Sequence, residues 1–141
     1  MLLNLTAVYG LRAMATLAGL GPGDSLNAAQ LSERTHVPQQ YLSKVMRKLV
    51  VAKLVRGRRG HGGGFSLQRP PRSIRIADVL KAIDVDLGMG CAFGFPSCDA
   101  SNPCSLHPIW SQLQSTLEAW TGDFTLGDLA PERAGRRRAG S

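Results

Sequence analysis

Two short amphipathic stretches with a tight break between them constrain the fold of this chain more than any other feature of its sequence. Asn27 and Gln30 have the spacing of a capping box, which predicts a helix through AAQLSERT. The segment His36-Val37-Pro38 interrupts this helix, and its proline suits the first turn of a second one, QQYLSKVMRKLV. In the second helix, apolar residues recur with helical spacing and form one stripe: Leu42, Val45, Met46 and Leu49. The pattern predicts a helix-turn-helix.

The second helix also has a polar face beside this stripe, made of Gln39, Gln40, Ser43, Lys44, Arg47 and Lys48. Amide and hydroxyl side chains suit the edges of DNA bases, and lysine and arginine suit phosphates. Helix pairs of this kind also occur in proteins that never touch nucleic acid. The helix pair alone therefore leaves DNA binding and a purely structural role open.

A glycine-rich hairpin follows the helix pair. Leu54-Val55-Arg56 and Phe65-Ser66-Leu67 are predicted as two short strands, joined through GRRGHGGG. Because glycines permit a tight turn with positive φ, the side chains between them form a thin basic tip: Arg58, Arg59 and His61. Such a tip suits a DNA minor groove. The alternative, a phosphate cradle for a nucleotide, lacks the G-K-[ST] ending and the βαβ context.

Charge is divided unevenly along the chain. Residues 1–75 hold 12 Lys and Arg against 2 Asp and Glu, whereas residues 76–141 hold 5 against 8. A basic half on an otherwise acidic chain indicates a polyanionic partner, most simply the phosphates of nucleic acid. A basic face that is merely solvated is the alternative.

The composition fits one compact domain with an appendage, since 43% of the 141 residues are hydrophobic. The apolar N-terminal run lacks the basic start and the small-residue cleavage site of a signal peptide. No window offers about eighteen uncharged apolar residues, which is the length that a membrane span needs. We therefore expect a cytoplasmic protein with no membrane partner.

A string of three cysteines and one histidine, C-x6-C-x5-C-x2-H, lies in the second half: Cys91, Cys98, Cys104 and His107. An odd number of cysteines cannot pair fully within one chain, so metal or cluster ligation is favoured over a disulfide framework. A structural zinc site is an alternative, although it usually contains a tight C-x2-4-C pair. A thiol-disulfide switch is another. A catalytic cysteine is a third, without an evident residue to orient its histidine.

Helices are predicted on both sides of this string, through IRIADVLKAIDV before it and IWSQLQSTLEAW after Pro108. In the later helix, spacings of 3, 4 and 3 relate Trp110, Leu113, Leu117 and Trp120. This seam favours a dimer helix over packing of both tryptophans within their own domain. The terminal segment, ERAGRRRAGS, is predicted to be a disordered basic tail.

Several motifs together resemble the iron-sulfur-sensing winged-helix regulators of the IscR and NsrR type, the Rrf family. They are Y-x-L-R-A-M, Q-Y-L in the second helix, R-G-H-G-G-G-F in the hairpin, I-x-x-A-D-V-L-x-A-I, C-x2-H-x2-W and T-L-G-D-L. The resemblance implies a mainly α fold with a small β-hairpin wing: a winged helix-turn-helix followed by a long C-terminal dimerisation helix. It also implies that Arg59 enters the minor groove.

The resemblance also implies a ligand set. Cys91, Cys98 and Cys104 match the family's three cysteine ligands, with a first spacing one residue longer than usual. His107 matches the histidine of the IscR branch, which holds a [2Fe-2S] cluster. The NsrR branch holds a [4Fe-4S] cluster with a carboxylate from the partner's first helix. Val8 stands at that position, and residues 1–23 contain no Asp or Glu. The IscR branch is therefore the closer match, with [4Fe-4S] and zinc as alternatives.

These observations predict a homodimeric, DNA-binding transcription regulator rather than an enzyme, whose operator binding is controlled by an iron-sulfur cluster. Residues 1–75 form the DNA-binding domain, 76–130 the cluster loop and dimerisation helices, and 131–141 the tail. Double-stranded operator DNA and a second copy of the chain are the predicted partners, with RNA polymerase as a further candidate. A winged-helix module that docks on protein is an alternative, as are a structural zinc and a thiol-disulfide switch in place of the cluster.

Overall fold

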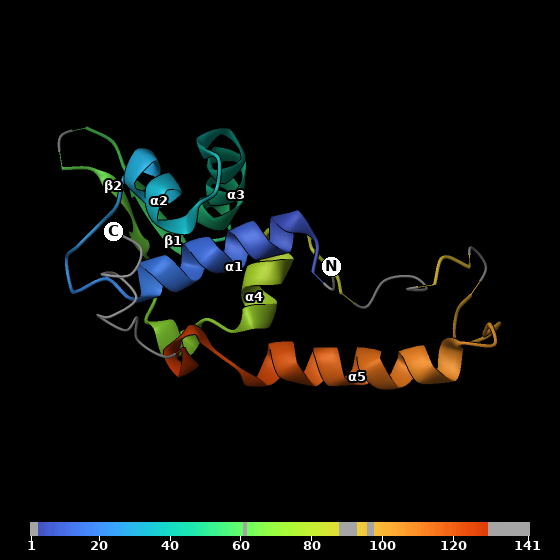
Figure 1. The fold of residues 1–141 in the computed structure, drawn as a ribbon. Coiled ribbons are helices and arrows are strands. Elements are labelled where there is room, and N and C mark those ends of the chain that lie inside the picture. Colours follow the sequence, from blue (N-terminus) through green and yellow to red (C-terminus); the bar gives the residue numbers. More distant parts are fainter. Residues whose placement is uncertain (1–2, 61, 88–92, 96–97, 130–141) are drawn as a thin grey trace, which may run out of the picture.

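The fold is mainly helical with one two-stranded hairpin (Figure 1). A computed structural model describes residues 3–60, 62–87, 93–95 and 98–129; His61, Cys91 and the predicted tail at 131–141 lie outside these ranges. The elements in chain order are α1 (Leu5–Ala18), α2 (Ala28–Thr35), α3 (Gln39–Val51), β1 (Val55–Arg58), β2 (Gly64–Leu67), η1 (Pro71–Ser73), α4 (Ile76–Ala82), α5 (His107–Asp123) and η2 (Leu126–Asp128). The predicted fold class is confirmed.

The predicted helix-turn-helix forms through local hydrogen bonds. The Asn27 side chain accepts a bond from the Gln30 amide at 2.8 Å, and the Gln30 side chain accepts one from the Asn27 amide at 2.9 Å, so the capping box is confirmed. At the other end of α2, His36 takes a left-handed conformation with φ of 56°. Pro38 is the N-cap residue of α3. Proline has no backbone N–H, and no hydrogen bond within the helix requires one at this position. The break between the helices thus lies where the sequence predicts it.

One apolar core joins the first four helices. The predicted stripe of α3 is buried, with exposures from 0% to 6%, against residues of α1 that include Met14 and Leu17. Val79 and Ile83, at α4 and its end, belong to the same core. Gly10 permits the close approach of α1 to this region, because a Cβ there would lie 2.5 Å from Ile83 Cδ1. Helix α4 packs against α1 and α3. The domain boundary predicted after residue 75 stays a prediction.

The wing is an antiparallel hairpin in which Val55 pairs with Leu67 and Arg58 with Gly64. Its tip contains Gly60 and Gly62 at φ of 90° and 73°, as expected for a tight glycine turn. An isolated bridge fastens the hairpin to the chain before α2: the Leu26 amide donates to the Phe65 carbonyl at 3.0 Å, and the Leu26 carbonyl accepts from the Phe65 amide at 2.7 Å. The wing is therefore held by backbone bonds on two sides.

The long helix α5 lies beneath α1 and α4, and its N-terminal end reaches away from the winged-helix elements (Figure 1). Its C-terminal end is anchored, because Leu126 is buried in the core and Arg75 forms a bridge with Thr125. The turn that contains Cys98 and Cys104 therefore lies at the N-terminal, distal end of the helix.

The seam predicted on α5 is divided between covered and exposed positions. Trp110 is only 9% exposed and Leu117 is half-buried, in a row with Gln114 and Thr121 that faces the chain's own domain. The other two residues of the seam are exposed, Leu113 at 43% and Trp120 at 38%, as is Ile109 at 67%. Helical spacing alone does not show which of these positions the domain itself covers. The exposed apolar row thus keeps Leu113 and Trp120 of the predicted seam and adds Ile109.

Replacing Gly64 by alanine is expected to destabilise the protein by about 1–3 kcal/mol, the usual cost of overpacking. A Cβ on Gly64 would lie 2.7 Å from the Leu26 carbonyl, which is backbone and cannot turn aside, and the φ of 155° adds strain. Thermal and urea unfolding measure the change. Gly122→Ala is the control, because nothing lies within 4 Å of its Cβ position. Equal stability of the two variants would contradict this account of the wing.

Candidate nucleic-acid interface and cysteine turn

The outward face of α3 carries the side chains predicted to read DNA. All six are exposed, because burial of the opposite stripe fixes the rotation of the helix: Gln39, Gln40, Ser43, Lys44, Arg47 and Lys48. The Ser43 hydroxyl donates to the Gln39 carbonyl at 3.0 Å. Its proton is thus used within the helix, and its oxygen remains an acceptor for a donor on a base. The geometry suits the roles predicted from the sequence, which stay proposals.

Lys48 differs from its neighbours, since its Nζ lies 3.0 Å from Asp84 Oδ2. This is the one ion pair among the residues that the structure describes. It joins the C-terminal part of α3 to Asp84, the second residue after the end of α4, which has a left-handed φ of 59°. No local sequence pattern indicates this ion pair, because the partners are 36 residues apart. A phosphate would have to compete with Asp84 for Lys48.

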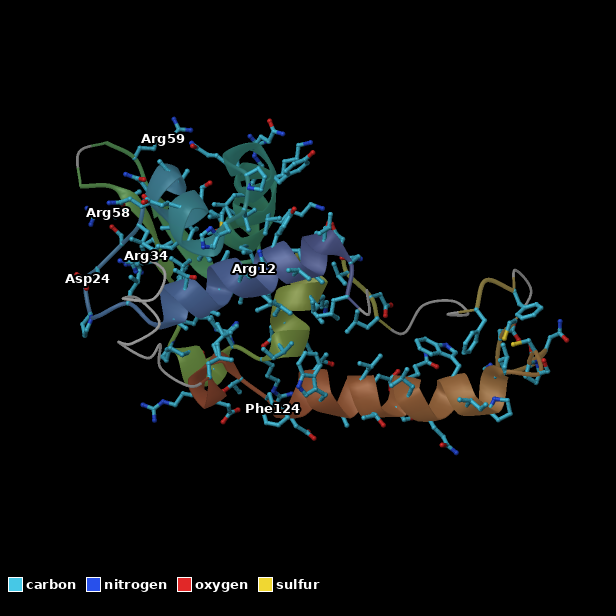
Figure 2. All side chains as sticks on the ribbon, in the orientation of Figure 1. Arg12, Asp24, Arg34, Arg58, Arg59 and Phe124 are labelled. Atoms are coloured by element: carbon cyan, nitrogen blue, oxygen red, sulfur yellow. The ribbon has the colours of Figure 1, made fainter. Side chains whose placement is uncertain are left out.

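A groove between α3 and the wing brings several predicted residues together. Its volume is about 580 Å³, and its polar lining includes Ser43 and Arg47 from α3 and Arg58 and Arg59 from the wing. Figure 2 shows Arg58 and Arg59 on the hairpin, and Asn27 and Ala28 at the start of α2 line the same groove. His61, the third predicted residue of the tip, lies outside the described residues. We refer to this surface as the α3-wing groove.

Sequence reasoning missed the apolar part of the same groove. Val51, at the end of α3, is 76% exposed and lines the groove with Val50 and Phe65. The sequence signal for this apolar part was the pair Val50-Val51 after Leu49, because only one of two consecutive residues of a helix can face the core. Asn27 also lines the groove, beside its role as the cap of α2.

The described part of the cysteine string is a compact turn that leads into α5. The Cys98 Sγ lies 3.4 Å from His107 Nδ1, and the Cys104 amide donates to the same sulfur at 3.4 Å. The His107 amide donates to the Cys104 carbonyl at 3.1 Å. Two of the four predicted ligands are thus adjacent, and the third is in the same turn. Cys91 lies outside the described residues.

Asp99 organises this turn. Its Oδ1 accepts bonds from the Ser101 hydroxyl at 2.6 Å and from the amides of Ser101 and Asn102 at 2.8 Å each. These bonds, that of the Ser101 hydroxyl first, hold the pKa of Asp99 below its ordinary value, and the charge of His107 adds to the effect. The sequence D-x-S-N is a recognisable signal for such an Asx turn, which sequence reasoning did not use.

The Cys98-His107 pair fits ligation of one metal ion. Sulfur and nitrogen ligands at about 2.3 and 2.1 Å from a tetrahedral ion lie about 3.6 Å apart, which is close to the 3.4 Å between these atoms. A donor to the ligand sulfur, here the Cys104 amide, is also a feature of iron-sulfur sites. Within the described ranges, no group of three His, Cys, Asp or Glu side chains is close enough to hold a metal. The complete ligand set stays a prediction.

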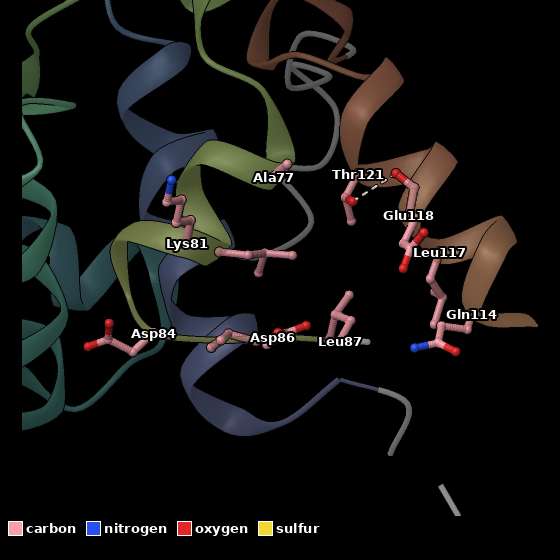
Figure 3. A pocket seen from close by; sticks show the side chains of 11 residues that line it. Ala77, Lys81, Asp84, Asp86, Leu87, Gln114, Leu117, Glu118 and Thr121 are labelled. Atoms are coloured by element: carbon pink, nitrogen blue, oxygen red, sulfur yellow. Dashed lines mark hydrogen bonds between the residues drawn. The ribbon is translucent and has the colours of Figure 1, made fainter. Parts of the chain in front are cut away.

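A further pocket, of about 580 Å³, separates α4 from α5 (Figure 3). Apolar side chains from both sides line it, including Leu80, Leu87 and Leu117. Glu118 lies at its edge, and its carbonyl accepts a bond from the Thr121 hydroxyl at 3.1 Å. The inner row of α5 is therefore only partly covered by α4.

The helix-turn-helix, the basic hairpin and the exposed polar face of α3 define a winged-helix transcription regulator. Residues 3–132 match the family model Rrf2, described as iron-dependent transcriptional regulator, and the chain belongs to this family. A putative HTH-type transcriptional regulator of Mycobacterium tuberculosis strain H37Rv is 33% identical over 92% of this chain and 81% of the relative. The transcriptional regulator IscR of Vibrio atlanticus is 31% identical over 86% of this chain and 70% of its own length.

Two solved structures share the fold. CymR, the global cysteine regulator of B. subtilis, superposes with a TM-score of 0.75 at 20% identity and covers 91% of this chain and 95% of its own. IscR of T. potens gives a TM-score of 0.68 at 24% identity, with coverage of 89% and 83%. Both likenesses confirm the predicted fold.

Family membership confirms the resemblance seen in the sequence. Members of this family are DNA-binding transcription regulators and not enzymes, so the catalytic-cysteine alternative is excluded. Among the described residues, no helix is long and apolar enough to cross a membrane.

Replacing Asp84 by asparagine is expected to tighten binding to any duplex DNA. The change frees Lys48 for a phosphate, so the dependence of log K on log salt should steepen by roughly one unit. Asparagine tolerates the left-handed conformation of Asp84. Fluorescence anisotropy on a random-sequence duplex at several salt concentrations measures both effects. Asp123→Asn makes the same charge change at the end of α5. If both variants bind alike, the ion pair does not restrain Lys48.

Replacing Cys98 or His107 by alanine is expected to remove most of the metal that co-purifies with the protein under anaerobic conditions. The two atoms are 3.4 Å apart, so each variant removes one half of the adjacent pair. Iron, zinc and sulfide counted per chain provide the measurement. His36→Ala is the matched control, because His36 is an exposed histidine between α2 and α3. Undiminished metal in both cysteine-turn variants would rule this pair out as ligands.

Proposed function

We propose that this chain is a homodimeric regulator that binds operator DNA through α3 and the wing, under the control of an iron-sulfur cluster. The observation that carries the DNA-binding part is the α3-wing groove, in which Arg47 from one element lies together with Arg58 and Arg59 from another. Two elements of different structure type that are adjacent in space can engage a major groove and the neighbouring minor groove together. Such binding places the protein in the compartment that holds the DNA.

Each predicted side chain has a role in this proposal. Gln39, Gln40 and Ser43 read base edges in the major groove, since amides and a hydroxyl acceptor match the patterns that bases present there. Basic residues of α3 hold phosphates: Lys44, Arg47 and Lys48. At the wing, Arg59 enters the minor groove, and Arg58 and His61 contact the flanking phosphates. Lys48 contributes less than its neighbours while it is paired with Asp84.

We assign the ligands of the cluster to Cys91, Cys98, Cys104 and His107. When bound, an iron-sulfur cluster supplies a centre whose charge and occupancy respond to oxidation and to iron supply. The adjacent Cys98 and His107 support this assignment, and a [2Fe-2S] cluster with one histidine is the form that we favour over [4Fe-4S] or zinc.

The exposed apolar row of α5 supports a dimer. Ile109, Leu113 and Trp120 present a hydrophobic stripe along the side of α5 that its own domain leaves exposed. Burial of such a row against a second copy would remove it from water. Two copies would then present two α3 helices to successive turns of the DNA.

A thiol-disulfide switch is the second candidate. It is favoured by the bond between the Cys104 amide and the Cys98 sulfur, which places both cysteines in one turn. The two candidates differ in iron and sulfide content, because a thiol switch needs neither.

Replacing Arg59 by alanine is expected to weaken operator binding roughly tenfold, with the loss concentrated on sites with narrow minor grooves. The operator is obtained by selecting duplexes from a random library with the wild-type protein. Affinity is then compared on two selected duplexes that differ only in A·T or G·C content under the wing. Unchanged affinity on both duplexes would show that the wing does not enter the minor groove.

A further inference from the structure

A second basic groove lies on the other face of the wing, between the hairpin and the segment that joins α1 to α2. Its volume is about 520 Å³, and polar groups form most of its lining. Arg56, Arg58 and Arg69 line it, against the single carboxylate of Asp24. Neither Arg56 nor Arg69 was among the residues predicted to bind DNA. We refer to this surface as the outer wing groove.

Strand geometry separates the two faces of the wing. Arg56 and Arg58 are two residues apart on β1, so both side chains point to the same face. Their partners across the hairpin are Ser66 and Gly64, whose small size leaves room for the guanidinium groups. Gly57 and its partner Phe65 face the other way, toward α3, because a Cβ on Gly57 would lie 3.8 Å from Val50 Cγ2.

Arg69 is oriented before any ligand binds. Its guanidinium donates to the Ser73 carbonyl at 2.6 Å, which holds the side chain of this exposed residue over the turn that follows β2. An arginine held in place loses less conformational entropy when it binds an anion. The three arginines and one carboxylate leave the groove with an excess of two positive charges.

We propose that the outer wing groove binds sugar-phosphate backbone of DNA, on the strand farther from α3. This inference rests on the proposed function, since it requires the wing tip to enter a minor groove. The minor groove is about 6 Å wide and has a backbone on each side. A hairpin inserted there therefore has phosphates at both faces. The α3-wing groove faces one backbone with Arg47 and Arg59, and Arg56 and Arg69 face the other.

Charge continuity favours DNA over an acidic protein segment as the occupant. Arg58 lines both grooves, so the two grooves share a positive residue at the end of β1. One polyanion that passes along both faces of the hairpin matches this arrangement. A separate acidic peptide would occupy only the outer wing groove, so it would not explain why the two grooves share Arg58.

The test compares Arg56→Gln and Arg69→Gln with wild-type protein on a duplex selected from a random library. Each variant is expected to bind more weakly and to lower the slope of log K against log salt by roughly one unit for each phosphate that it no longer neutralises. Arg72→Gln is the matched control, because Arg72 is a surface arginine three residues after Arg69 that does not line the groove. Hydroxyl-radical footprints should lose protection only on the backbone farther from α3.

Asp24→Asn is expected to change the affinity for DNA in the opposite direction. Removal of the single carboxylate should tighten binding and steepen the salt slope, while a variant that failed to fold would bind more weakly. Unchanged slopes in Arg56→Gln, Arg69→Gln and Asp24→Asn, with normal wild-type binding, would overturn the proposal. Absence of salt-dependent DNA binding by the wild-type protein would instead refute the proposed function itself.

Discussion

Burial of one stripe of α3 against α1 and α2 is the interaction on which the rest of this structure depends. Leu42, Val45, Met46 and Leu49 are almost fully buried, and each contributes about 1.5–3 kcal/mol through removal from water. Rotation of α3 about its axis would expose them together, at a cost comparable to the whole stability of a small domain. The polar face of the helix is therefore held outward with little freedom. The exposure of this face, through which we propose that the protein reads DNA, is a consequence of how the core is packed.

The cysteine turn and the polar face of α3 are connected through α5 and α4. The turn leads directly into α5, whose anchored end contacts the core beside α4. Where α4 ends, Asp84 reaches the reading helix through its bond to Lys48. A rearrangement at the turn can thus bias α3 by way of α5 and α4, without any contact between the turn and DNA. The pocket between α4 and α5 leaves room for these helices to shift against each other.

Local sequence signals predicted most of the fold. The capping box at Asn27, the break at Pro38 and the glycine turn of the wing depend on residues close in the chain, and each was confirmed. Helical spacing alone placed Trp110, Leu113, Leu117 and Trp120 on one seam of α5, and it could not show that only Leu113 and Trp120 are exposed. That difference depends on packing against α4, which is distant in sequence.

The same limit applies to the candidate site. The α3 residues proposed to read DNA could be named from a single helix, whereas the Lys48-Asp84 pair and the outer wing groove join segments far apart in the chain. Long-range pairs of this kind arise from packing and leave no local pattern. The Asx turn at Asp99 is different, since its D-x-S-N signal was present in the sequence.

The central claim is that the state of the cysteine turn sets the affinity for DNA. Its most direct test takes wild-type protein purified without oxygen, removes iron from half of it with a chelator, and measures the dissociation constant of both halves for one selected duplex. The account predicts that the two constants differ by about fivefold or more, the range of typical coupling energies, and that His107→Ala abolishes the difference. Equal constants for the two wild-type samples, with loss of iron verified, would contradict it.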